Sequence, residues 1–282
     1  MLILSPLKAK NLIRDSVSRR ISGGLSKSNK NSQAEEPESD ELTYSSRSSH
    51  DEKSVVKELQ DFCHEHDIKF LEETIYRFAV FYKFDLELSR RAIQQNKAND
   101  YLNLELTGSM RRQIATRVIF PLSGLQTRKE KMEVCYIHAS RIFDLQVAEG
   151  SPTHHRMIEN LCYILNDFSR TKEQCVQGVA VIISMKHCDK SKFSLDLWMQ
   201  VMMALQGNLV PTIVKSVLLV DSPKWFHNNI WKTQARTTLA PSFVRKFRLI
   251  EGSHLLNGEY FADGCMKAIC RQVWVDGNWR MK

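Results

Sequence analysis

The sequence lacks an apolar run of the ~18–20 residues needed to span a bilayer, so we expect no transmembrane helix. Its seven cysteines include no C-x-x-C pair, which argues against a zinc ribbon or a disulfide framework and favours reduced cytosolic thiols. Cys63-His64-Glu65-His66 offers metal-type ligands, but residues this close on a helix cannot close one tetrahedral site. We therefore predict neither a metal nor another cofactor.

Motifs of nucleotide binding and hydrolysis are also missing. The chain has no G-x-G-x-x-G, no P-loop and no G-x-S-x-G. His187-Cys188 resembles the start of a tyrosine-phosphatase signature, but the arginine expected six positions after the cysteine is Ser194. We predict that the protein is not an enzyme; an α/β enzyme with an unrecognised site is the weaker alternative.

Charge is unbalanced towards the basic side, with a net +8 at pH 7. Such a balance suits an anionic partner: a phospholipid surface, an acidic protein or a nucleic acid. Aromatic residues are not interleaved with the basic ones as in a base-stacking platform, so we expect no nucleic-acid binding. Residues 1–50 are rich in Ser, Lys, Arg and Asn, which predicts a disordered tail; a transit peptide and a lipid-attracted basic arm are alternatives.

Periodic patterns divide the remaining chain into three parts. Residues 52–106 read as a small helical unit, residues 112–264 alternate strands with helices, and residues 265–282 form a C-terminal tail. Strands separated by helices predict crossover connections, hence an α/β domain with a largely parallel sheet covered by helices. We expect strands at Val134–Ser140, Val176–Ser184, Val217–Val220 and Phe247–Ile250, and helices at His155–Phe168, Phe193–Gln206 and Trp225–Leu239.

One segment carries a family resemblance. Pro211–Gly252 runs strand, proline, aromatic helix and basic strand, and this order resembles the CRAL-TRIO family of lipid-binding and lipid-transfer domains, of the yeast phosphatidylinositol-transfer type. Tyr76–Asp85 is similar to the signature of the helical segment that precedes those domains. The spacing from Pro211 to Phe226 most resembles the lipid-binding module at the front of a non-receptor tyrosine phosphatase. The chain ends before a phosphatase domain begins, so we expect a free-standing relative or part of a longer product.

The resemblance implies a phospholipid, phosphoinositide or other hydrophobic small molecule held in an apolar cavity. It also implies a mobile gate helix over Trp225–Leu239 and peripheral docking of a cytoplasmic protein on membranes. The expected cavity and gate residues are Trp198, Met199, Met202, Phe226, Ile230, Trp231 and Leu239. The expected headgroup- or membrane-facing residues are Lys224, Lys232, Arg236, Arg245, Lys246 and Arg248.

Two positions depart from the pattern of phosphoinositide-binding relatives. Those relatives pair a glutamate with a lysine; Lys246 stands at the lysine position, but Thr212 stands where the glutamate would be. The family's closing Leu-Pro-x-x-Gly-Gly is also degraded around Leu255–Gly264. These departures favour an alternative: a non-catalytic membrane- or protein-targeting module with a collapsed cavity.

Overall fold

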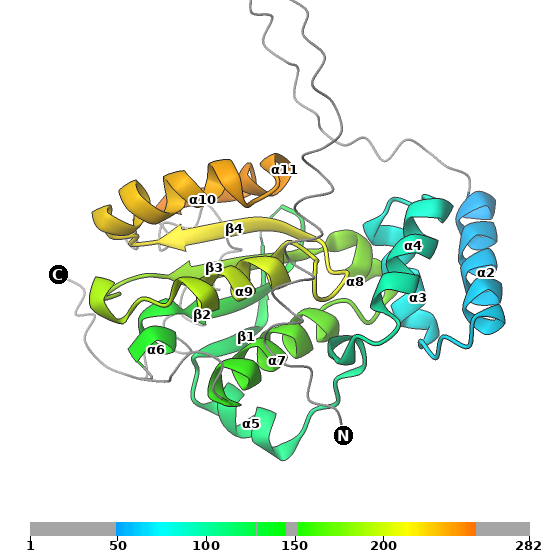
Figure 1. The fold of residues 1–282 in the computed structure, drawn as a ribbon, viewed down its shortest axis with the longest axis horizontal. Coiled ribbons are helices and arrows are strands. Elements are labelled where there is room, and N and C mark those ends of the chain that lie inside the picture. The colour runs from blue at the N-terminus through cyan, green and yellow to red at the C-terminus, as the bar shows by residue number, and fades with distance from the viewer. Residues whose placement is uncertain (1–48, 128, 145–151, 252–282) are drawn as a thin grey trace, which may run out of the picture. The chain divides into compact units, whose positions relative to one another are not determined.

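The computed structural model describes residues 49–127, 129–144 and 152–251. Within these ranges a five-stranded sheet has the order β1-β2-β3-β4-β5 (Figure 1). β1 pairs with β2 in antiparallel orientation, and the other three pairings are parallel. The predicted α/β class with a largely parallel sheet is confirmed. The strands are β1 (Ile119–Gln126), β2 (Glu133–His138), β3 (Val179–Ser184), β4 (Val214–Val220) and β5 (Phe247–Ile250).

Helices connect the parallel strands and cover one face of the sheet. The connections contain α6 (Ala139–Asp144), α7 (Pro152–Asp167), α8 (Lys172–Gln177), η2 (Lys190–Lys192), α9 (Leu195–Leu205), the π-helix η3 (Phe226–Trp231), α10 (Lys232–Thr237) and α11 (Pro241–Val244). In Figure 1, α7 and α9 lie in front of the strands. Because successive crossovers that run in one direction along the sheet share a hand, they place their helices on the same face.

Side-chain alternation along the strands separates two apolar clusters. Ile137, Val181 and Leu219 belong to the cluster that also contains the buried residues of α7, α9 and the β4–β5 connection. Tyr136, Ile182 and Leu218, their chain neighbours, point to the opposite face and belong to the second cluster. β3 is buried at every position, as its unbroken apolar run predicts.

Four helical elements precede the sheet: α2 (Ser49–Glu65), α3 (Glu72–Phe81), α4 (Leu86–Asn96) and the 3₁₀ turn η1 (Asp100–Asn103). A fifth, α5 (Gly108–Ala115), leads into β1. Side chains cap the N-termini of several helices: Asp85 accepts a hydrogen bond from the Leu88 amide of α4, and Thr107 accepts one from the Met110 amide of α5. Residues 52–106 thus contain α2, α3, α4 and η1 joined by short non-helical segments, and Leu59 and Cys63 on α2 are buried.

Three expectations need correction. Val176 was placed in a strand, but it belongs to α8, whose Thr171–Gln174 capping box starts a helix and whose end at Gly178 adopts φ 71°. β1 was not predicted, because Pro121 argues against a strand; at the sheet edge a proline is tolerated. The expected helix over Trp225–Leu239 is present and continuous, but it contains the π-helical stretch η3, passes into α10 and ends at Thr237, before Leu239.

Candidate lipid-binding site

An aromatic cluster joins α9 to the segment that follows β4. The Trp198 ring lies 5.0 Å from that of Phe226, at an interplanar angle of 81°. Phe193, just before α9, lies 5.7 Å from Phe226 and 5.5 Å from Trp225. Such edge-to-face contacts are each worth about 0.5–1.5 kcal/mol beyond the burial of apolar area. The cluster therefore holds the start of the expected gate against α9.

The expected cavity and gate residues lie in one apolar core, with different degrees of burial. Met202 and Phe226 are fully buried, and Met199 and Ile230 are half-buried. The remaining expected cavity and gate residues, all buried, are Trp198, Trp231 and Leu239. Trp231 reaches across to β5, where its ring lies 4.4 Å from that of Phe247. The structure thus packs the expected lining of α9 and the expected gate against one another and against the sheet.

The segment Trp225–Val244 begins with a π-helix, in which the backbone closes wider turns than in an α-helix. Phe226 and Trp231, at its two ends, are buried, whereas Asn228 and Asn229 between them are exposed. Asn228 accepts a 3.3 Å hydrogen bond from the Lys232 ammonium. This segment is amphipathic, with aromatic residues facing the core and amides and a lysine facing solvent.

Trp198 carries an unpaired polar atom inside the apolar core. Its side chain is 2% exposed, and its indole N–H has no hydrogen-bond acceptor. A buried donor without a partner is uncommon, because it loses its hydrogen bond to water and gains none. Sequence reasoning placed Trp198 in the cavity lining but did not identify this unpaired donor.

Basic side chains line the outer side of the same region. Lys224, Lys232, Arg245 and Arg248 are exposed, as expected for residues that face a membrane or a headgroup. The side chain of Arg236 lies outside the described part of the structure. All four exposed residues belong to the β4–β5 connection or to β5 itself, so the topology gathers them next to the amphipathic segment.

Lys246 differs from the exposed basic residues because it is half-buried. Loss of hydration lowers the pKa of its ammonium group, and the neighbouring charge of Lys215 lowers this pKa further. Among the described residues no carboxylate forms an ion pair with Lys246. Two lysines side by side without a carboxylate form a local positive potential that an anion would neutralise.

Thr212, at the position of the missing glutamate, is buried and satisfied within the protein. Its hydroxyl donates a 3.2 Å hydrogen bond to the Leu165 carbonyl and accepts one of 3.4 Å from the Ser169 hydroxyl. The side chain ties the start of β4 to the end of α7. It therefore has a structural role and does not pair with Lys246.

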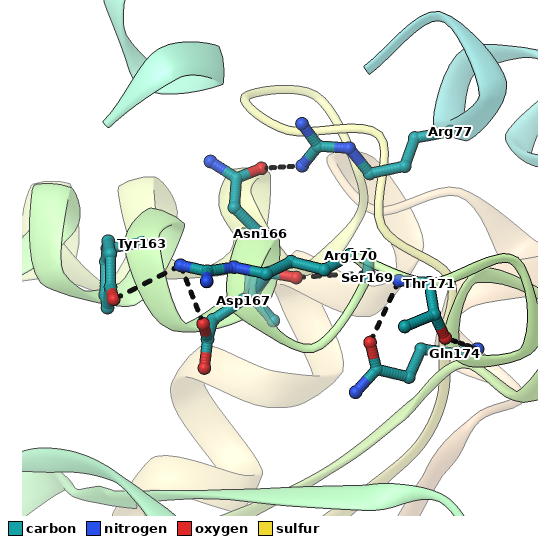
Figure 2. A network of polar contacts seen from close by, with 9 residues as sticks. Arg77, Tyr163, Asn166, Asp167, Ser169, Arg170, Thr171 and Gln174 are labelled. Carbon is teal, nitrogen blue, oxygen red and sulfur yellow. Dashed lines mark hydrogen bonds and ion pairs between the residues drawn. The ribbon is translucent and has the colours of Figure 1, made fainter. Parts of the chain in front are cut away.

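A buried polar network links the N-terminal helices to the sheet-bearing part (Figure 2). Arg77 on α3 is 5% exposed and donates hydrogen bonds to the Asn166 side chain on α7 and to the Thr74 hydroxyl, the latter over 2.7 Å. Asn166 in turn donates a 2.7 Å hydrogen bond to the Tyr101 carbonyl in η1. Burial lowers the pKa of the Arg77 guanidinium. This network makes the helices part of the same packed structure as the sheet.

Three further properties of the described residues concern metal-ligand groups, membrane-spanning helices and cysteine reactivity. They contain no group of three or more His, Cys, Asp or Glu side chains that could hold a metal ion. None of their helices is long and apolar enough to cross a membrane. Their five cysteines are buried, and burial raises the pKa of the Cys135 thiol to about 12.

Comparison with known families agrees with this geometry. Residues 125–262 match the family model of the CRAL/TRIO domain. The chain therefore contains a CRAL-TRIO domain over these residues, which makes it a protein of the lipid-binding and lipid-transfer kind. The resemblance seen in Pro211–Gly252 is confirmed, whereas the likeness to the phosphatase module stays a prediction.

Solved structures share the fold. The crystal structure of Sfh5 superimposes with a TM-score of 0.53 at 10% sequence identity, over 76% of this chain and 85% of that one. At this identity the likeness concerns the fold alone. A search of curated proteins found no match.

Proposed function

We propose that the protein binds a phospholipid between the sheet, α9 and the amphipathic segment Trp225–Val244, and that it docks on anionic membranes through the basic residues around that segment. The observation that carries this proposal is the amphipathic character of the segment. Its aromatic residues pack on α9 and β5, and its lysine points to solvent. A segment built in this way exposes an apolar face to a bilayer when it swings away from the core. No catalytic step is proposed.

Membrane attraction follows from the exposed cations. Each lysine or arginine near an anionic surface contributes ~1 kcal/mol. Lys224, Lys232, Arg245 and Arg248, all exposed in the β4–β5 connection or β5, together supply several such contributions. Lys246 is the candidate for the lipid phosphate, because it is half-buried, lies beside Lys215 and has no carboxylate partner. A glutamate–lysine pair for an inositol ring is not available, since Thr212 is used internally.

A second candidate function is a non-catalytic targeting module that binds membranes or proteins without an internal ligand. The contact between Trp198 and Phe226 favours it, because two of the expected lining residues pack directly against each other at the junction of α9 and the gate. The two functions differ in one respect only: whether a lipid is carried inside the protein.

Mass spectrometry of the purified protein, first native and then denatured, decides between them. A released lipid near one per chain supports the carrier function. A ligand-free protein that still co-sediments with phosphatidylserine vesicles supports the targeting module. A protein that does neither contradicts the carrier function and membrane targeting, and leaves only a module that binds proteins.

The docking surface is tested by charge reversal. Lys246→Glu is expected to weaken binding to phosphatidylserine vesicles more than Lys53→Glu, an equal charge change on exposed α2. Equal losses would mean that only the net charge of the protein matters, and the assignment of Lys246 would be wrong.

A further inference from the structure

The unpaired indole N–H of Trp198 lies where α9 packs against the amphipathic segment Trp225–Val244. Trp198 sits on α9, and its ring contacts Phe226 at the start of the amphipathic segment and Phe193 just before α9. The surrounding rings offer no oxygen acceptor, and the side chain is too buried to use bulk water. A donor in this position gains a hydrogen bond only from something that enters the apolar core.

The choice of acceptor narrows the class of ligand. A pure hydrocarbon chain has no acceptor, and an ionised phosphate would have to be buried beside aromatic rings, away from the basic residues that suit it. An ester carbonyl is neutral, accepts one or two hydrogen bonds and lies between the headgroup and the acyl chain of a phospholipid. An ether oxygen at the same place is a much poorer acceptor.

We propose that the Trp198 N–H donates a hydrogen bond to an ester carbonyl oxygen of the bound lipid, and that the protein therefore selects diacyl over dialkyl lipids. This inference rests on the proposed function, because it needs a lipid inside the protein. It adds a specificity-determining residue to a site whose other expected members are apolar or positively charged. Selectivity arises because the carbonyl satisfies a donor that an ether lipid leaves unpaired.

The test offers the purified protein vesicles that contain equal amounts of diacyl and di-O-alkyl lipids with matched chains. Two headgroups are used, phosphatidylcholine and phosphatidic acid, so that a charge preference does not hide the comparison. Lipid carried away by the protein is counted by mass spectrometry. We expect the wild-type protein to prefer the diacyl form by about 3- to 10-fold, the range of one neutral hydrogen bond.

Two variants separate the hydrogen bond from packing. Trp198→Phe keeps an aromatic ring but removes the donor, and it is expected to lose the preference while still carrying lipid. Tyr136→Phe is the control: it also removes a buried donor, but Tyr136 belongs to the second apolar cluster, on the opposite face of the sheet from Trp198. This control is expected to keep the preference.

A second measurement covers the case in which Trp198→Phe does not fold. The indole ¹⁵N–¹H resonance of Trp198 in the wild-type protein is expected to move downfield with diacyl lipid and to move less with dialkyl lipid. Equal uptake of the two lipids by the wild-type protein, or a preference that survives in Trp198→Phe, overturns the inference but leaves lipid binding intact. Uptake of neither lipid overturns the carrier function and this inference with it.

Discussion

Gly207 is a position outside the lipid site where one added methyl group is expected to destabilise the protein. It follows α9 with φ 89°, a conformation that favours glycine. A Cβ atom there would lie 2.2 Å from a carbon of the Phe81 ring, which belongs to α3. The close approach lets the turn after α9 rest on the N-terminal helices. Gly207→Ala therefore strains the backbone and also pushes the turn after α9 away from Phe81 on α3.

The magnitude follows from these two effects. The left-handed backbone conformation costs a non-glycine residue about 1–2 kcal/mol. Overpacking against a ring that has to move costs a further ~1–2 kcal/mol, at the lower end because Phe81 is only half-buried and can turn outward. Together they give about 2–4 kcal/mol. For a protein of this size the melting temperature is expected to fall by roughly 5–15 °C.

Thermal unfolding followed by circular dichroism measures the effect. Gly108→Ala is the matched control, because its new Cβ would meet only the end of the Arg112 side chain, 4.0 Å away, at the start of a helix. This control is expected to change stability little or to raise it by up to ~1 kcal/mol. In the double variant with Phe81→Ala the overpacking contribution should disappear. A melting temperature of Gly207→Ala within about 1 °C of the wild type would refute the reasoning.

Three further predictions concern buried polar groups. Arg77→Met leaves the acceptors on Asn166 and Thr74 without their donor, so urea denaturation should show a loss of about 2–4 kcal/mol; a loss below ~1 kcal/mol would contradict the network. Lys246→Met removes a cation that is costly to bury, and it should raise stability at pH 7 by about 0.5–1 kcal/mol while weakening binding to phosphatidylserine vesicles. The sign follows from the lowered pKa, because the ammonium group of Lys246 keeps its proton more tightly in the unfolded chain than in the folded protein. In the wild-type protein, the free energy of unfolding therefore rises as pH increases from the folded-state pKa towards 10.5, where the cost of burying the charge is lost. For Cys135, a pKa near 12 predicts alkylation by iodoacetamide at pH 8 roughly a thousand times slower than for an ordinary cysteine, and peptide mass spectrometry would contradict this if the native and unfolded rates agreed within tenfold.

Much of the fold was predictable because its signals are local. The apolar run of β3 and the stripes of α7 and α9 identify buried strands and amphipathic helices directly. Their alternation then implies parallel crossovers. β1 was missed because Pro121 and Gly124 make its sequence a poor strand by itself. It forms a strand because it pairs with β2 at the edge of the sheet. For α8 a local signal existed in the Thr171–Gln174 capping box, but the apolar run that follows concealed it.

The candidate site was predictable in its membership but not in its contacts. A family pattern assigned Trp198, Phe226 and Lys246 to it, and the structure placed the first two in edge-to-face contact. That the Trp198 donor has no partner, and that Lys246 lies beside Lys215, depends on residues far apart along the chain.

Sequence patterns were enough to predict the alternation of helices with the strands β2 to β5, the family resemblance and the basic character of the β4–β5 region. These properties depend on residues near one another in the chain: periodicity, turn chemistry and local charge. The packing of distant segments was needed to show that Thr212 is used internally, that Arg77 binds α7 and that Trp198 packs edge-to-face on Phe226. Burial and hydrogen-bond partners are set by the packing of distant segments, and no local pattern specifies which polar group that packing leaves without a partner.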